Sequence, residues 1–205
     1  MTRIVFRCDG SSFFGLGHVV RSLAISSELR RMGAEVIFIT EEDRVSLQKI
    51  READFTVDVK PPGACNDAYT RRAFFEHHAD ILVVDVKHYA FSAESVKLWT
   101  GWHAPVVMID PMCSGMSEAS LVIFTNGHQD MDTLSLWQET WSVEKDDSAP
   151  MSSGRLTRHA PTATGRMLHG SEYAVLNERI TRIQLGREKL DKGLLITMGG
   201  SDPKN

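Results

Sequence analysis

The chain has 205 residues, of which 42% are apolar and 24% charged, a balance typical of a soluble globular protein rather than a disordered one. Its formal net charge of -4 argues against a nucleic-acid partner, because nucleic-acid binders usually carry a basic surplus. The three cysteines are widely spaced without a CxxC pair, which indicates a reducing compartment and no zinc site. With no signal peptide and no apolar run long enough to span a membrane, we expect a cytoplasmic protein.

The chain opens with a strand, a loop, a helix and a second strand. Residues 3–9 are expected to form a short buried strand, and the Gly- and Ser-rich residues 10–17 a loop. A helix is predicted over 18–32, with Gly33 as its C-terminal cap, and a strand over 35–40. This order predicts a βαβ unit with parallel strands.

The alternation of strands and helices continues to residue 126. We predict helices over 43–53, 66–78 and 92–100, and strands over 55–59, 81–86, 105–110 and 121–126. The unbroken apolar run in 81–86 is typical of a central parallel strand that is covered on both faces. Residues 1–126 are therefore expected to form the core of an α/β domain, a Rossmann-like doubly wound parallel sheet.

The regular pattern is lost after this core. Residues 127–166 are rich in Ser, Thr, Pro and Gly, and we expect a long loop or partly disordered insert there. Residues 167–192 are expected to complete the first domain and provide a linker. In 193–205 a strand runs into Gly-Gly-Ser-Asp-Pro, the usual start of a further βα unit. We therefore expect a second domain that is only begun, and possible self-association through the surface that such a domain would cover.

The stretch GLGHVVRS contains the first candidate for chemistry. Gly15, Gly17 and His18 lie where the first strand passes into the first helix, and backbone N–H groups there can converge on an anion. The motif is neither the GxGxxG dinucleotide fingerprint nor a Walker loop. Ligands of open parallel sheets bind beyond the carboxyl ends of the strands, so His18 is expected at the mouth of a cleft. Spacing alone leaves His18 evenly balanced between a proton acceptor and a capping or packing residue.

Three segments, in the right order, resemble one family of nucleotide-sugar hydrolases. The first contains R-x-D-x-S at Arg7, Asp9 and Ser11, followed by G-x-G-H-x-x-R from Gly15 to Arg21. The second is LHGSEYAVLNERI, and the third is TMGGSDPKN at the end of the chain. The segments are similar to those of the UDP-2,4-diacetamido-2,4,6-trideoxy-β-L-altropyranose hydrolases of pseudaminic acid biosynthesis and of their relatives among spore-coat polysaccharide proteins.

The resemblance implies a GT-B architecture, in which a nucleotide-sugar lies between two Rossmann-like halves. It also implies that water attacks the anomeric carbon and releases UDP, with His18 as the base and with no cofactor or metal. The substrate-binding residues that it implies come from both halves: Asp9, Ser11, Gly15, Gly17 and Arg21 from the first, and Gly199, Gly200 and Ser201 from the second.

Two segments depart from the family pattern. The Asp-His-Tyr triplet of the family is DVKHY here, so Asp85, His88 and Tyr89 are substrate-binding candidates with two residues inserted between them. The usual Ile-Asp-Asp is Ile-Asp-Pro at 109–111, where the proline removes a backbone donor. Asn126 matches the asparagine that usually follows the next strand.

Several alternatives remain open from the residues alone. For Asp85, a place in the cleft and a structural hydrogen-bonding role are about equally favoured. For Arg21, exposure to solvent or pairing within the domain is favoured over contact with an anion. Cys8 is expected to be a small buried side chain. The scattered histidines lack the spacing of metal ligands. A GT-B glycosyltransferase with a nucleotide-sugar donor is the first functional alternative, and an inactive truncated half is the second.

Overall fold

The computed structural model describes residues 1–11, 15–86, 91–101, 104–111, 113–125, 141–144, 154–158, 166–169, 173 and 175. Its strands are β1 (Arg3–Cys8), β2 (Glu35–Glu41), β3 (Thr56–Lys60), β4 (Ile81–Asp85), β5 (Val106–Ile109), β6 (Leu121–Phe124), β7 (Trp141–Glu144), β8 (Gly154–Arg158) and β9 (Arg166–His169). Its helices are α1 (Gly17–Arg31), α2 (Arg44–Glu52), α3 (Asn66–Glu76), α4 (Ala93–Trp99) and the 3-10 helix η1 (Ser114–Glu118).

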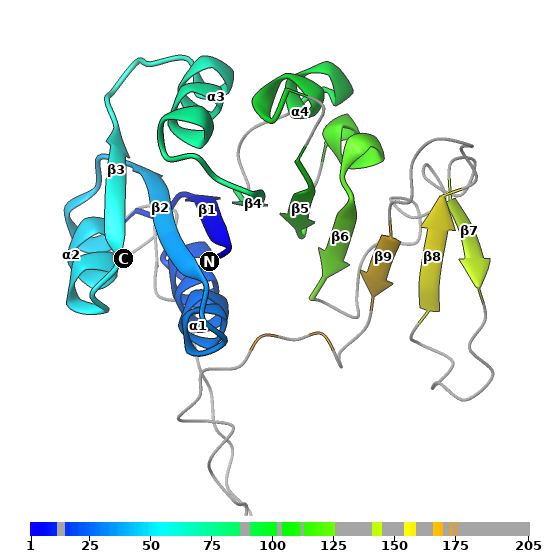
Figure 1. The fold of residues 1–205 in the computed structure, drawn as a ribbon, viewed down its shortest axis with the longest axis horizontal. Helices are drawn as coiled ribbons and strands as arrows, with labels where there is room; N and C mark the ends of the chain where they lie inside the picture. Colours follow the sequence, from blue (N-terminus) through cyan, green and yellow to red (C-terminus); the bar gives the residue numbers. More distant parts are fainter. Residues whose placement is uncertain are drawn as a thin grey trace, which may run out of the picture.

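All nine strands belong to one sheet of order β3-β2-β1-β4-β5-β6-β9-β8-β7 (Figure 1). From β3 to β9 every neighbouring pair is parallel, and one helix connects each strand to the next as far as β6. The predicted α/β, Rossmann-like doubly wound sheet is confirmed. Each predicted helix and strand up to residue 126 is present, with ends that differ by a few residues at most.

Beyond β9 the sheet continues with an antiparallel pair. β8 pairs with β9 and with β7, and both pairings are antiparallel. The segment 127–166, expected to be a loop or insert, thus contributes two strands at the sheet edge (Figure 1). These short strands carry no long apolar run that would announce them in the sequence. The predicted domain start at 193–205 lies outside the described residues.

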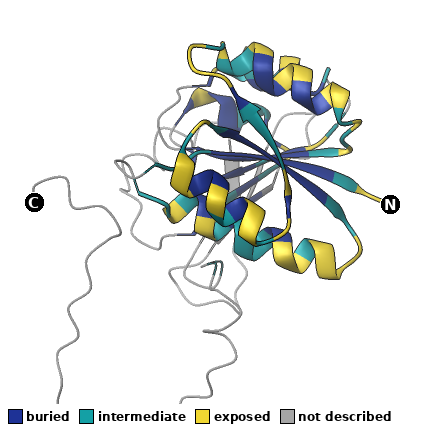
Figure 2. Ribbon diagram, turned by 90° about the vertical axis from the view of Figure 1, so that its left-hand side faces the viewer, coloured by how far each residue is buried: buried dark blue, intermediate teal, exposed yellow. Residues whose placement is uncertain are grey.

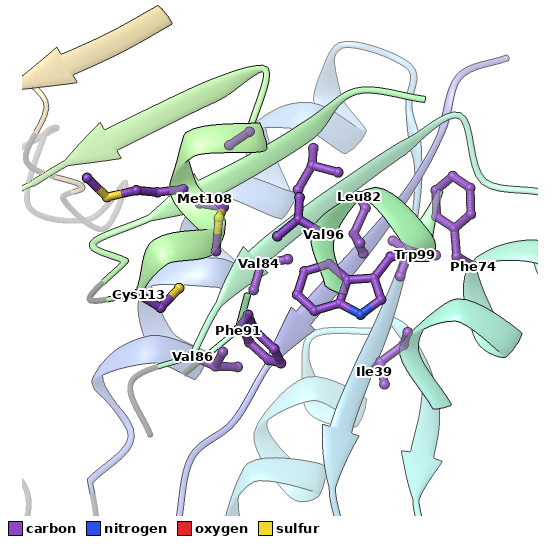
Figure 3. Close-up of a cluster of buried hydrophobic side chains, with 14 of the residues drawn as sticks. Ile39, Phe74, Leu82, Val84, Val86, Phe91, Val96, Trp99, Met108 and Cys113 are labelled. Atoms are coloured by element: carbon purple, nitrogen blue, oxygen red, sulfur yellow. The ribbon is translucent and has the colours of Figure 1, made fainter. Parts of the chain in front are cut away.

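Two apolar clusters fill the space between the sheet and its helices. On one face, α3, α4 and η1 cover a cluster in which the rings of Phe91 and Trp99 pack edge to face, with their centroids 4.5 Å apart (Figure 3). On the other face, α1 and α2 cover a cluster that includes the stacked rings of Phe6 and Phe38. The central strands β1, β2 and β4 are accordingly buried on both faces, while the helices expose their outer sides (Figure 2). This two-sided burial explains the continuous apolar runs of the central strands.

Helix α1 packs on the sheet through small side chains as well as apolar ones. Val19, Ser22 and Ser26 are buried along it, and Leu23 packs against the same cluster. Val20, by contrast, is 42% exposed. The small serines allow a close approach to the strands, which the apolar periodicity alone could not indicate. No helix in the described part of the chain is long and apolar enough to cross a membrane.

Candidate active site

The candidate site lies at the carboxyl ends of the central strands. Asp85 is the last residue of β4, and its backbone pairs in register with Cys8, the last residue of β1. The loop after β1 leads directly into α1, whose first turn carries His18. Asp110 and Thr125 follow β5 and β6, the next two strands of the sheet. Four neighbouring strand ends and one helix start therefore converge where a doubly wound sheet usually binds its ligand.

His18 is held by a buried carboxylate. Its Nδ1 lies 2.6 Å from Oδ1 of Asp85, whose side chain is fully buried, while the His18 side chain is 23% exposed. An ionised carboxylate only accepts hydrogen bonds, so Nδ1 carries the proton and donates it to Asp85. This tautomer leaves the lone pair on Nε2, which makes no hydrogen bond with any described residue. The arrangement matches a general base oriented by a carboxylate.

Arg21, one turn further along α1, connects two carboxylates. Its Nε donates to Oδ2 of Asp85 at 2.9 Å, and its Nη2 donates to Oδ1. Nη1 donates to Asp110 and, at 2.9 Å, to Oγ1 of Thr125. Nη2 also lies 3.3 Å from Nδ1 of His18. Arg21 is thus paired within the domain, and its charge is shared between Asp85 and Asp110.

These contacts keep Asp85 ionised in spite of its burial. Burial acts to raise the pKa of the Asp85 carboxyl, but the hydrogen bonds from His18 and Arg21 and their charges outweigh it and hold that pKa below its ordinary value. Burial likewise acts to lower the pKa of Arg21, and the contacts with Asp85 and Asp110 more than compensate. Ser22 adds a further donor to Oδ2 of Asp85 at 3.2 Å. Asp85 is thus an ionised hydrogen-bond acceptor for the His18 ring near neutral pH.

The loop that precedes α1 folds back on itself. Ser11 and Gly15 exchange two backbone hydrogen bonds, of 3.2 and 2.8 Å, and Gly15 has a φ of 91°, a conformation that favours glycine. A Cβ at Gly10 would lie 2.8 Å from the side chain of Val19, so this glycine permits the contact between loop and helix. Gly17 is the first residue of α1, and a Cβ there would meet no atom of the described residues within 4 Å.

Asp9 belongs to a different set of contacts. Its Oδ1 accepts a hydrogen bond from the backbone N–H of Glu41 at 3.0 Å and another from Arg7. Arg7 is fully buried and also donates to Oδ1 of Asn66 at 3.2 Å. Asp9 and Arg7 therefore tie the end of β1 to β2 and α3. Cys8, between them, is buried as predicted, and burial raises the pKa of its thiol.

The structure brings together three of the residues selected from the sequence, His18, Arg21 and Asp85, and adds three more. We call these six residues the His18 cluster: His18, Arg21, Ser22, Asp85, Asp110 and Thr125. Asp110 had a sequence signal in the Ile-Asp-Pro segment, whereas Ser22 and Thr125 had none. Four other candidates are described between the end of β1 and the start of α1 but do not join this cluster: Asp9, Ser11, Gly15 and Gly17. The last six lie outside the described residues: His88, Tyr89, Asn126, Gly199, Gly200 and Ser201. Within the described ranges, no group of three or more His, Cys, Asp or Glu side chains is arranged to hold a metal ion.

Comparisons with known proteins give only distant similarities. No family model matches the chain. Over 56 residues, 27% of this chain and 12% of the relative, it is 41% identical to uncharacterized protein MJ1062 of Methanocaldococcus jannaschii. The chain therefore spans a small part of that relative.

Part of the chain is similar to solved structures of MurG and HepE. MurG of Acinetobacter baumannii is 11% identical with a TM-score of 0.46, over 61% of this chain and 41% of MurG. Anabaena Alr3699/HepE, in complex with UDP and glucose, is 13% identical with a TM-score of 0.45, over 66% of this chain and 41% of HepE. The chain spans about two fifths of each. Similarities this distant identify neither a substrate nor a reaction.

Proposed function

We propose that this chain hydrolyses a UDP-linked acetamido-deoxy sugar, releasing UDP by attack of water at the anomeric carbon. The observation that carries the proposal is the pairing of His18 with the buried, ionised Asp85, which directs Nδ1–H inward and leaves Nε2 as a base. The substrate class comes from the sequence resemblance. The reaction is proposed to belong to pseudaminic-acid or surface-polysaccharide biosynthesis, in the cytoplasm.

In the proposed reaction, Nε2 of His18 removes a proton from water as the water oxygen bonds to the anomeric carbon. The bond between that carbon and the phosphate oxygen breaks, and its electron pair leaves with UDP. A single displacement of this kind inverts the configuration at the anomeric carbon. Asp85 keeps the ring in the correct tautomer and stabilises the imidazolium that forms.

Asp85 acts through His18 rather than on the sugar. Its side chain is fully buried, and both carboxylate oxygens are engaged, Oδ1 by His18 and Oδ2 by Ser22, with Arg21 donating to each. A covalent glycosyl intermediate on Asp85 would require it to leave all these donors. The proposed pathway is therefore direct attack by water.

The substrate contacts are assigned from position and resemblance. We place the sugar beside His18, next to the loop of Ser11, Gly15 and Gly17, and propose further contacts from His88, Tyr89 and Asn126. Gly199, Gly200 and Ser201 are proposed to hold the UDP group. Since two carboxylates share the charge of Arg21, we assign it to the positioning of Asp85 instead of to the diphosphate.

Release of UDP tests this function directly. The chain is incubated with UDP-2,4-diacetamido-2,4,6-trideoxy-β-L-altropyranose and with other UDP-acetamido sugars, and UDP is followed by phosphorus NMR. We expect release without any added acceptor, and a loss of about 10²- to 10⁴-fold in His18→Asn, the range typical of a general base. His78→Asn, at an exposed histidine after α3, serves as the matched control and is expected to retain full activity.

Three results would contradict the proposal in different ways. Full turnover by His18→Asn would remove His18 as the base. Release that requires an added sugar acceptor would show a glycosyltransferase, in which the same base deprotonates a hydroxyl group. No release from any of the UDP-sugars would refute the hydrolase itself.

A further inference from the structure

Asp110 has a backbone conformation that its position does not explain. It has a φ of 45°, in the left-handed region that non-glycine residues seldom occupy. Asp54 and His78 share that conformation, but each follows a helix, where a left-handed residue is a common way to end it. Asp110 follows strand β5 instead. Such strain persists where surrounding contacts enforce it, and it concentrates at functional sites.

The contacts of Asp110 converge on Arg21. Oδ1 accepts a hydrogen bond from the backbone N–H of Thr125 at 2.7 Å, and Oδ2 accepts one from its hydroxyl at 2.6 Å. Nη1 of Arg21 then donates both to Oδ2 and to the hydroxyl oxygen of Thr125. The end of β5 is thereby locked to the end of β6, and both present acceptors to one nitrogen of the guanidinium.

We propose that Asp110 and Thr125 are positioning residues that act on His18 through Arg21 and Asp85. The inference rests on the proposed function, in which His18 is the base. The guanidinium is planar, so an anchor on Nη1 fixes the directions of Nε and Nη2, the two groups that hold Asp85. Without it, the guanidinium can turn, and Nη2 already lies 3.3 Å from Nδ1 of His18.

Asp110 also affects the charge around His18. Among the described elements, Asp85 faces the ring from β4, Arg21 from α1, and Asp110 from the end of β5 behind Arg21, while Asp9 after β1 is paired with Arg7. The single guanidinium of Arg21 is thereby shared between two carboxylates, those of Asp85 and Asp110. Without the charge of Asp110, Arg21 would be left to neutralise Asp85 alone.

The test compares two aspartates that share the left-handed conformation. Asp110→Asn removes the charge, and asparagine tolerates this backbone, so the variant is expected to fold. Asp54→Asn makes the same change at an exposed turn after α2. The tautomer of the neutral His18 ring is followed by proton–nitrogen NMR in the full chain. We expect the Nδ1-protonated form to lose population in Asp110→Asn, where the guanidinium can turn towards Nδ1, and to keep its population in Asp54→Asn.

A second pair of variants tests the hydroxyl of Thr125. Thr125→Ser keeps the hydroxyl, and Thr125→Val removes it at nearly constant volume. We expect Thr125→Ser to behave as wild type, and Thr125→Val and Asp110→Asn to lower kcat for UDP release about tenfold with little change in KM. A role in substrate binding would raise KM instead.

The inference is overturned if the ring has the same tautomer populations in wild type and in folded Asp110→Asn. It is also overturned if Asp54→Asn lowers kcat as much as Asp110→Asn does, because the effect is then one of general stability. Equal behaviour of Thr125→Val and Thr125→Ser would remove Thr125 from the proposal. If the wild type releases no UDP, the proposed function fails, but the tautomer still decides whether Asp110 acts on the ring.

Discussion

The described residues include two aspartate–histidine pairs in different surroundings. At the carboxyl edge of the sheet, Asp85 holds Nδ1 of His18 at 2.6 Å, and its side chain is fully buried. On strand β3, Asp58 holds Nε2 of His77 at 3.0 Å, and its side chain is 18% exposed. Asp85 has a guanidinium partner in Arg21, whereas Asp58 is contacted by the hydroxyl of Tyr69 and, within the described residues, by no arginine or lysine.

The comparison shows that surroundings, and not residue types, separate a candidate base from a structural pair. A buried carboxylate that a guanidinium keeps ionised is also held in one position, so that it can select one tautomer of the ring. The Asp58 pair joins α3 to the neighbouring strand, and solvent weakens it. Substitutions at matched positions in the two pairs should therefore have very different effects.

Replacing the two aspartates should give the largest difference. In Asp85→Asn the ring loses the acceptor that fixes its tautomer, and we expect UDP release to fall by about 10³- to 10⁴-fold. The unfolding free energy should also fall, by about 3 kcal/mol, because a buried ion pair is broken. Asp58→Asn should leave activity unchanged and cost about 1 kcal/mol or less. Turnover assays and urea unfolding measure both, and equal losses in the two variants would contradict the distinction.

Removing the arginine should separate a buried cation from an exposed one. Arg21→Met leaves Asp85 buried and without its cation, and we expect the unfolding free energy to fall by about 3–5 kcal/mol. Arg31→Met, in the exposed pair with Glu28 at the other end of α1, is the control and should unfold as wild type does. Urea unfolding compares them. A tolerated Arg21→Met would show that Asp85 does not depend on this charge.

The lowered pKa of Asp85 predicts a loss of stability in acid. A carboxyl whose pKa is lower in the folded state stabilises the fold at any pH above the ordinary pKa of aspartate, near 4. That stabilisation is lost as pH falls further, through the lowered pKa. The unfolding free energy should therefore decrease below about pH 4 more steeply in wild type than in Asp85→Asn. Asp58→Asn should retain the wild-type slope. Identical slopes in wild type and Asp85→Asn would contradict the assignment.

The smallest effect is expected at alkaline pH, in the Asp58 pair. Burial, together with the hydrogen bond to Asp58 and its charge, raises the pKa of Tyr69 to about 12. The neutral Tyr69 side chain therefore stabilises the fold up to about pH 10, the ordinary pKa of tyrosine. That contribution is lost as pH rises from about 10 to about 12. Tyr69→Phe should weaken this alkaline loss without altering UDP release. Phenolate absorbance that shows Tyr69 ionising near pH 10, the ordinary pKa of tyrosine, would contradict the raised pKa.

The fold could be predicted because local patterns determine most of it. Apolar runs such as 81–86 indicate strands buried on both faces. Gly33 follows the end of α1, as its place in the sequence suggested, and its N–H donates to the carbonyl of Arg30 at 2.9 Å. The strands β7 and β8 were not predicted, because they come from short segments in a polar stretch. They pair at the sheet edge, where long-range register counts for more than local sequence.

The site could be predicted only in part, because its contacts depend on strand order. The glycines before His18 indicated a helix start at a cleft, and Asp85 at a strand end was a reasonable candidate. That the two meet follows from β1 lying beside β4, which no local pattern reveals. The roles of Asp110 and Thr125 depend in the same way on the neighbouring positions of β5 and β6.

The tautomer of the His18 ring tests the central claim most directly. A long-range proton–nitrogen NMR spectrum of the full chain, with the ring neutral and its signals assigned by their loss in His18→Asn, shows which nitrogen carries the hydrogen. The account predicts a ring protonated at Nδ1, held by Asp85, and a weaker preference in Asp85→Asn. A wild-type ring protonated at Nε2 would contradict this prediction, because Nε2 could then not accept a proton from water.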